Sequence, residues 1–391
     1  MGRRTSPDRQ GRSVQDHERP VRPRSVRRAS PSPPCPREHQ IALPIRVPDV
    51  ARYVFIGAGA VGSAIGGLLA QQQIDVLLVA RGDHAQAMIN NGLTVRCPDL
   101  SFTVRPKTVT GPEQARLRVD DVLVLTTKSH QAEAAVQTWA DAPVYDGDAE
   151  VGRAGERLPI LIALNGVAGE EIALRYFDRV YAVCVWTPVV MIEPGEVLVR
   201  SVPRRGVFHV GRYGGSTDRA ADDALLDTVA KDWQSAAFTV HRPAAVMEWK
   251  YRKLISNLSN VFQALLGDTS QAGELKEAAD AEARRVLSAA GIAVTSDEDE
   301  RAAREDSFHV QPIPGEPAEL GGSTWQSLVR GTGSIETDYL NGEIALIGRR
   351  VGHPAPINAR LAGLARSAAR NGLRPGAVGV DELTAILTGS E

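Results

Sequence analysis

The chain has 391 residues, of which 43% are hydrophobic and 24% charged, and its formal net charge at pH 7 is −2. This length and composition are typical of a soluble globular protein with two domains. The three scattered cysteines form no CxxC pair, and no apolar run reaches the roughly 18 residues of a membrane helix, which argues against a disulfide framework, a structural zinc site and a membrane span.

The first 48 residues form a tail that is rich in Arg, Pro and Ser. The tail has 11 arginines and 4 acids, a charge of +7 against −2 for the whole chain, which leaves −9 for the rest. Since it lacks apolar periodicity, we expect it to be disordered. We interpret it as the product of a start codon assigned too early; an Arg-rich transit peptide is the alternative. Because the basic excess lies outside the folded body, we expect no nucleic-acid binding.

From Tyr53 onward, short apolar runs alternate with helical segments. Within the runs, apolar and polar residues do not alternate, which is typical of parallel strands buried on both faces. We therefore predict an α/β fold with a Rossmann-type, doubly wound parallel sheet. The predicted strands are residues 53–59, 74–81, 120–128 and 158–166, with weaker segments near 93–95 and 102–104, and the predicted helices are Val61–Gln72, Ala85–Asn91 and Gln131–Trp139.

The middle of the chain is less regular. Asp141–Arg157 is polar and contains glycine, and we expect it to form a loop inserted before the next strand. We expect further strands with turns between Tyr181 and Gly211. His130 and His209 could serve as acid–base groups, but we expect both in loops or on the surface.

After about Val240 the pattern changes to helical periodicity, and no comparable strand follows Val246. We predict a Rossmann domain at residues 49–239 and an all-helical C-terminal domain at residues 240–391. The active site is expected in the cleft between them.

A glycine motif follows the first predicted strand. Its residues, Gly57-Ala58-Gly59-Ala60-Val61-Gly62, match GxGxxG at a strand end before a helix. In dinucleotide-binding folds the first glycine allows the turn, the second lets the backbone approach a pyrophosphate, and the third lets helix and strand pack. The helix N-terminus then offers free N–H groups to the phosphates. A glycine turn with only a packing role is the alternative.

The end of the second predicted strand indicates which dinucleotide binds. An NAD enzyme has an acid there for the ribose 2′-hydroxyl, whereas this strand ends in Arg81. A guanidinium suits a 2′-phosphate through paired hydrogen bonds. Asp75 lies at the far end of the strand and Asp83 lies beyond it. The sequence therefore predicts NADPH/NADP+ as the cofactor.

Further motifs make the chain resemble a known family. In order they are GAGAVGS, VARG, TTKSHQ, LNG, WKYRKLISN and ETDYLNG, and they run through both predicted domains. This order resembles the ketopantoate reductases (2-dehydropantoate 2-reductases) from about Tyr53 to the C-terminus. The resemblance implies NADPH-dependent reduction of ketopantoate to pantoate, a step of pantothenate and coenzyme A biosynthesis, with NADPH and an α-keto acid bound between the domains.

The resemblance also implies roles for seven residues, by position in these motifs. Lys128 and Gln131 match cofactor-binding residues, and Asn165 matches an asparagine that contacts both cofactor and substrate. The catalytic pair corresponds to Lys253 and Glu336, and the substrate-binding residues correspond to Asn257 and Thr324.

The chemistry of these residues agrees with such a reaction. Hydride delivery to a ketone leaves an alkoxide that a lysine such as Lys253 can protonate. Asn257 is spaced i,i+4 from Lys253 and shares its helix face, and Glu336 could hold the lysine charged. Each residue also has an ordinary interpretation: Lys253 as a solvated lysine beside Lys250, and Glu336 as a helix N-terminal acid.

Two other functions stay open at this point. One is a related NADPH-dependent reductase that acts on another 2-keto acid. The other is a non-catalytic NADP(H) sensor. For the enzyme we expect a small-molecule α-keto acid substrate, no nucleic acid, no metal, no membrane, a cytoplasmic location, and a monomer or a homodimer.

Overall fold

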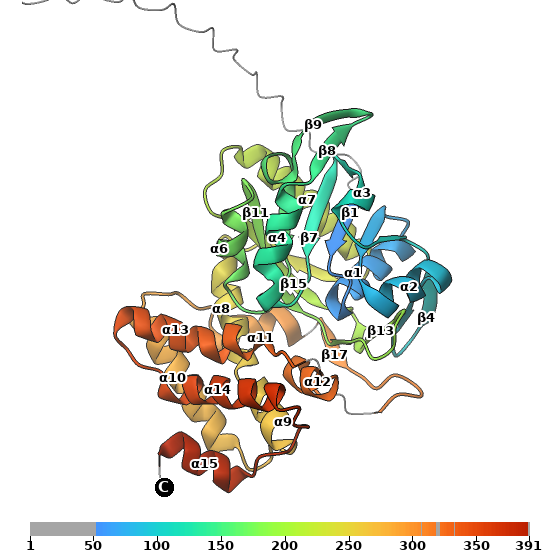
Figure 1. Cartoon of the computed structure of the whole chain (residues 1–391). Helices are drawn as coiled ribbons and strands as arrows, with labels where there is room; N and C mark the ends of the chain where they lie inside the picture. Colours follow the sequence, from blue (N-terminus) through green and yellow to red (C-terminus); the bar gives the residue numbers. More distant parts are fainter. Residues whose placement is uncertain (1–51, 306, 318–320, 332, 390–391) are drawn as a thin grey trace, which may run out of the picture. The chain divides into compact units, whose positions relative to one another are not determined.

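The computed structural model describes residues 52–389 except 306, 318–320 and 332. The described residues belong to one compact unit. The predictions made for the tail, residues 1–48, lie outside them. The chain is α/β, with strands in the first part and mostly helices after His241 (Figure 1). The division into two domains at residue 240 stays a prediction.

An eight-stranded sheet forms the main structure of the first part. Every neighbouring pair is parallel except β11 and β15, which are antiparallel. In order across the sheet, the strands are β16 (Thr239–His241), β15 (Val207–Tyr213), β11 (Arg179–Trp186), β10 (Pro159–Ile162), β7 (Asp121–Leu125), β1 (Arg52–Ile56), β2 (Val76–Val79) and β5 (Lys107–Val109). The predicted parallel sheet is thus confirmed.

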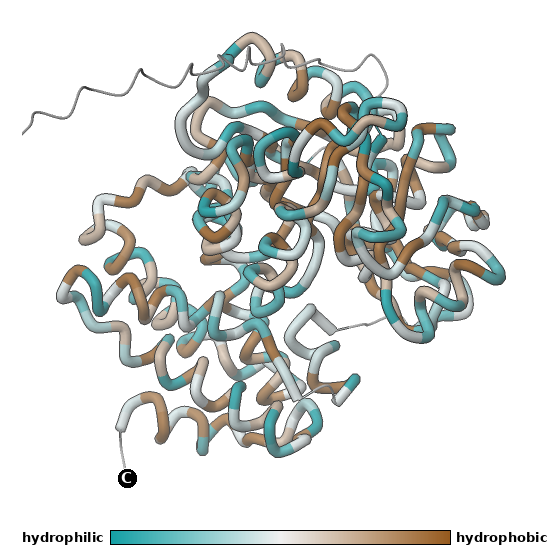
Figure 2. Tube along the Cα trace, turned by 45° about the horizontal axis from the view of Figure 1, so that its top comes forward, coloured by the Kyte–Doolittle hydropathy of each residue, from teal (hydrophilic) through white to brown (hydrophobic). Residues whose placement is uncertain are grey.

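Both faces of this sheet are buried, which explains the unbroken apolar runs. In β1, Tyr53 and Phe55 belong to one hydrophobic cluster, whereas Val54 and Ile56 belong to another. Helices α1 (Ala60–Gln71) and α7 (Arg219–Ser235) supply residues to the first cluster, and α4 (Ala132–Ala140) and α6 (Gly169–Leu174) supply the second. In Figure 2, brown hydrophobic segments gather in the middle of the molecule. Among the described helices, none is long and apolar enough to cross a membrane.

The expected loop at Asp141–Arg157 is wrong. This stretch forms the hairpin β8 (Pro143–Asp146) and β9 (Ala149–Arg153), followed by α5 (Ala154–Arg157). Gly147 turns the hairpin at a φ of 61°. The two residues between the strands, Gly147-Asp148, are a standard hairpin signal, which the polarity of the stretch concealed.

His209 also departs from expectation, because it is buried in β15 and not on the surface. Its ring stacks on Trp249 at 3.7 Å between centroids and on His241 at 4.9 Å. His130 lies exposed in a short 3₁₀ helix, Ser129–Gln131, in agreement with its prediction.

Smaller elements surround the main sheet. A second sheet has the order β12 (Val189–Val190), β13 (Glu196–Val199), β3 (Leu93–Arg96) and β4 (Ser101–Val104), and a third has β6 (Leu117–Arg118) beside β8 and β9. Two further helices are α2 (Gly82–Asn91) and α3 (Pro112–Ala115).

The described residues after Val246 are mostly helical, as predicted, and they include one short strand. That strand, β17 (Phe308–Val310), pairs antiparallel with β14 (Ser201–Pro203). The helices are α8 (Val246–Asn257), α9 (Asn260–Leu266), α10 (Gly273–Ala289), α11 (Asp297–Glu305), α12 (Ser323–Val329), α13 (Asn341–Val351), α14 (Pro356–Arg370) and α15 (Val380–Thr388). A 3₁₀ helix, Glu336–Tyr339, precedes α13.

Candidate active site

The glycine motif forms the turn between β1 and α1. Gly57 has a φ of 98°, which a side chain rarely adopts. A Cβ on Gly62 would lie 2.5 Å from Oγ1 of Thr126, so this glycine lets α1 pack close to the end of β7. Around Gly59, by contrast, a Cβ would meet nothing within 4 Å. There is therefore no room for a side chain at Gly62, where helix and strand meet. There is free space next to Gly59, the second glycine of the motif.

Arg81 is exposed at the start of α2, directly after β2. Asp83 lies in the first turn of α2. His84, which the sequence did not single out, links this helix to the glycine turn: its Nε2 lies 3.1 Å from Oγ of Ser63, and its Nδ1 accepts a hydrogen bond from the Gly195 N–H at 2.8 Å. The loop after β2 is thus fixed beside the start of α1.

Glu336 lies at the start of its 3₁₀ helix and contacts the turn after β7. Its Oε2 accepts a hydrogen bond from Nζ of Lys128 at 2.7 Å. Its Oε1 accepts two from Ser129, from the backbone N–H and from Oγ, both at 2.9 Å. Burial works to raise the pKa of Glu336, but Lys128 and the Ser129 donors outweigh burial and lower it. The carboxylate is therefore held charged.

The asparagines predicted to bind substrate meet beside this carboxylate. The Asn257 Nδ2 donates to Oδ1 of Asn165 at 3.4 Å, and the backbone oxygen of Asn165 accepts from Oγ of Ser129 at 3.2 Å. The next residue, Gly166, has a φ of 80°, and a Cβ there would lie 2.7 Å from the Tyr339 carbonyl oxygen. The loop after β10 can thus approach the Glu336 segment only with glycine at this position.

A second ion pair lies behind the same loop. Lys250 of α8 pairs with Glu170 of α6, and the Lys250 Nζ also donates to the Leu164 carbonyl oxygen at 3.1 Å. The two side chains are 2% and 0% exposed, so water does not share this contact. Since Leu164 precedes Asn165, the pair fixes the backbone that carries the asparagine.

Lys253 lies one helical turn before Asn257 on α8. Its Nζ is 3.8 Å from the centre of the Trp186 ring, at the end of β11. Burial is the main cause that lowers the pKa of Lys253 to about 8, with Arg304 acting in the same direction. The expected contact between Lys253 and Glu336 does not form among the described residues, because Glu336 pairs with Lys128 instead. Lys253 is therefore a partly buried amine packed against an indole ring, and it gives up its proton more readily than a lysine in water.

Among the described residues, the side chains of the two remaining predicted residues, Thr324 and Gln131, make no hydrogen bond to this group. Thr324 is buried on α12, and Gln131 is partly buried at the end of the first 3₁₀ helix. A Cβ on Gly321 would lie 2.3 Å from the Trp325 ring, so glycine lets the chain turn closely into α12. The Gly322 N–H donates to Oε1 of Gln263 at 2.8 Å, which fixes α12 against α9.

Sequence reasoning missed Ser129 and Lys250. Ser129 follows Lys128 in the TTKSHQ motif, where a hydroxyl next to a predicted site residue was a usable signal. Lys250 gave no such signal, because it lies in the basic run WKYRK and its partner is 80 residues away.

Comparison with known proteins agrees with the motifs. The family model described as "Ketopantoate reductase PanE/ApbA" matches residues 53–215, and its C-terminal companion matches residues 245–369, so that together they cover more than half of the chain. A curated relative, the 2-dehydropantoate 2-reductase of Pyrococcus horikoshii, is 27% identical over 311 residues, which are 78% of this chain and 92% of the relative.

Solved structures show the same fold. A PanE/ApbA family ketopantoate reductase from Ralstonia eutropha superposes with a TM-score of 0.64 at 24% identity, over 82% of this chain and 99% of that one. A ternary structure of D-mandelate dehydrogenase with NADH and anilino(oxo)acetate superposes with a TM-score of 0.66 at 21% identity, with the same coverage.

Proposed function

The chain belongs to the ketopantoate reductase family, and from this premise we propose that it reduces 2-dehydropantoate to pantoate with NADPH. As a member it is an oxidoreductase that acts on CH–OH groups. The observation that carries the proposal is the meeting of Glu336 and Asn257 from the helical part with Lys128, Ser129 and Asn165 from the sheet part.

The glycine turn fits a nicotinamide dinucleotide. The open space at Gly59 and the N-terminus of α1 suit a pyrophosphate, which backbone N–H groups bind at helix N-termini. When bound, the reduced cofactor supplies the hydride. Arg81 is exposed where a ribose 2′-phosphate would lie in such a fold, and this supports NADPH over NADH.

The residues of the site divide the remaining work. Asn257 and Thr324 would bind the substrate carboxylate, and Asn165 would position the keto group between cofactor and lysine. Lys253 would give its proton to the alkoxide, for which a pKa of about 8 is well matched near neutral pH. Glu336 would orient the substrate through its carboxylate, which Lys128 and Ser129 hold in place.

The first experiment measures NADPH oxidation with ketopantoate and with a panel of other 2-keto acids. We expect the highest kcat/KM with ketopantoate. Clear turnover of another acid, with none of ketopantoate, would refute the named substrate. The likeness to D-mandelate dehydrogenase makes aromatic 2-keto acids the second candidate to include.

Two variants test the residue roles. Lys253→Met should abolish turnover while NADPH still binds, whereas Lys231→Met, a change of an exposed lysine on α7, should leave both unchanged. Arg81→Asp should weaken NADPH binding far more than NADH binding. Equal losses for the two dinucleotides would contradict the assignment of Arg81, and full turnover in Lys253→Met would contradict that of the lysine.

A further inference from the structure

Two cations share one indole ring at the end of β11. The Lys253 Nζ lies 3.8 Å from the centre of the Trp186 ring, and Cζ of Arg304 lies 4.5 Å from the same centre. Both contacts are within the range of cation–π attraction. Because both distances start from one point, the two cations lie within about 8 Å of each other, which is close enough for repulsion between partly buried charges.

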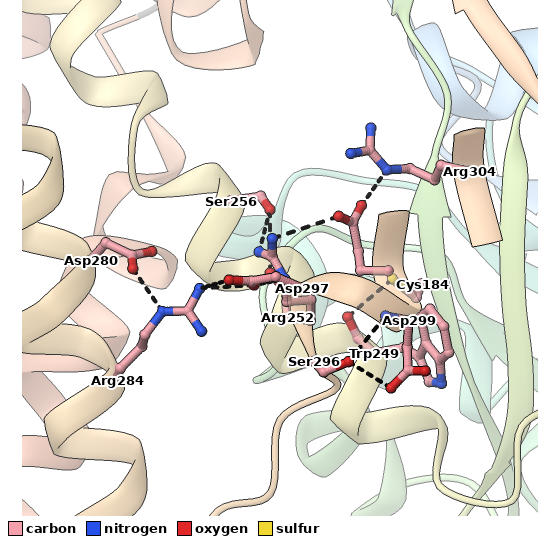
Figure 3. Close-up of polar contacts among 11 residues, drawn as sticks. Cys184, Trp249, Arg252, Ser256, Asp280, Arg284, Ser296, Asp297, Asp299 and Arg304 are labelled. Atoms are coloured by element: carbon pink, nitrogen blue, oxygen red, sulfur yellow. Dashed lines mark hydrogen bonds and ion pairs between the residues drawn. The ribbon is translucent and has the colours of Figure 1, made fainter. Parts of the chain in front are cut away.

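Arg304 is held in place by an ion network that joins α8, α10 and α11. Glu300 pairs with Arg304 and also lies 3.6 Å from Arg252. The Arg252 Nε lies 2.8 Å from Asp297, which in turn contacts Arg284 of α10 at 3.0 Å (Figure 3). The Glu300 side chain is 4% exposed, so this carboxylate is part of the interior.

Three titratable groups from neighbouring elements face Lys253: Cys184 of β11, and Glu300 and Arg304 of α11. Burial raises the pKa of the Cys184 thiol to about 12, which leaves it neutral. The charges that act on the amine therefore come from α11. They act in opposite directions, since the guanidinium favours a neutral amine and the carboxylate favours a charged one.

We propose that Arg304 and Glu300 are positioning residues that together set how readily Lys253 gives up its proton. The proposal deepens the proposed function, because it rests on Lys253 as the acid of the reduction. Neither α11 residue needs to touch the substrate. Burial alone can only lower the pKa of Lys253. A paired arginine and glutamate shift it in opposite directions, so their effects on the amine partly cancel.

The direct test is a titration of Lys253 by NMR. The chain has six lysines, so labelling with [ε-13C]lysine gives few signals, and the Lys253 signal is the one lost in Lys253→Met. In Arg304→Gln the unbalanced Glu300 should raise the Lys253 midpoint by about one pH unit. In Glu300→Gln the unbalanced Arg304 should lower it by a similar shift. The double variant should return close to the native value.

The controls separate charge from structure. Arg301→Gln removes an exposed arginine from the same helix and should leave the midpoint unchanged. Arg304→Lys keeps a cation beside Trp186 and should restore the native midpoint. The Lys250 signal, from an amine sealed against Glu170, should not follow the changes on α11.

Kinetics give an independent readout. The rate of keto acid reduction should fall at high pH as Lys253 loses its proton. The pH at which the rate falls should be higher in Arg304→Gln and lower in Glu300→Gln. Unmoved or parallel midpoints in the two variants would overturn the inference. Opposite NMR shifts in a protein that reduces no keto acid would support the inference about the amine and refute the proposed function instead.

Discussion

The molecule contains two lysine–glutamate pairs close to the loop of Asn165, and they differ in access to water. In the pair of Lys250 and Glu170 both side chains are sealed, at 2% and 0% exposure. In the pair of Lys128 and Glu336 the lysine is 35% exposed and the glutamate 8%. The first pair can only fix the backbone behind the asparagine. The second has a side open to a ligand.

The two carboxylates also differ in how many hydrogen-bond donors they have. Both oxygens of Glu336 accept hydrogen bonds, from Lys128 and Ser129. Among the described residues, Oε2 of Glu170 has no hydrogen-bond partner, and burial raises the pKa of Glu170 despite Lys250. A buried charge of this kind contributes little net stability, but removal of its partner is costly.

The largest expected effect comes from breaking the buried pair of Lys250 and Glu170. Lys250→Met should lower the free energy of unfolding by about 3–5 kcal/mol, because the Glu170 carboxyl group is left in the interior without its cation. Denaturant unfolding at neutral pH measures it. The double variant Lys250→Met/Glu170→Gln should recover most of the loss. A single variant as stable as the native protein would show that water reaches Glu170 after all.

Breaking the partly exposed pair of Lys128 and Glu336 should lower the activity and have little effect on stability. Lys128→Met should reduce kcat/KM about 100-fold, which corresponds to about 2.7 kcal/mol of transition-state stabilisation, because an exposed cation beside the site is lost. The free energy of unfolding should change by no more than about 1 kcal/mol, since Ser129 still supplies two donors to Glu336. A loss of stability equal to that of Lys250→Met would remove the distinction between the pairs.

Ser129→Ala should give the smallest of these effects. It removes one of the two donors to Oε1 of Glu336 and the contact with the Asn165 backbone oxygen. We expect about a 10-fold loss of kcat/KM, the equivalent of one hydrogen bond to a charged group. Ser327→Ala is a matched control, because that hydroxyl donates only to Ser323 within α12. Steady-state kinetics that fail to separate the two variants would assign Ser129 a packing role.

The parts of the fold that are set by residues close together in the chain could be predicted from the sequence. The glycine turn and the parallel sheet follow from local patterns, because a strand end, a turn and a helix start leave their signals within about ten residues. The hairpin that turns at Gly147-Asp148 also had a local signal, although the polarity of the stretch favoured a loop. His209 was misplaced because one histidine within an apolar strand gives no sign of the aromatic rings above it.

The contacts that assemble the site are of another kind. Glu336 is 207 residues from Ser129, and Lys250 is 80 from Glu170. A basic run such as WKYRK is usually a solvated helix face, and only packing distinguishes Lys250, which is sealed, from Lys253, which faces Trp186. Composition and periodicity do not contain this information.

The long separation between Glu336 and its donors has a consequence for the order of events during synthesis. The last strand of the main sheet ends at His241, and Glu336 leaves the ribosome roughly 95 residues later. For that interval the nascent chain carries every strand of the main sheet, but the Glu336 carboxylate that binds Lys128 and Ser129 has not yet been synthesised. A translation product released early would thus retain the strands for a dinucleotide fold yet lack the carboxylate of the site.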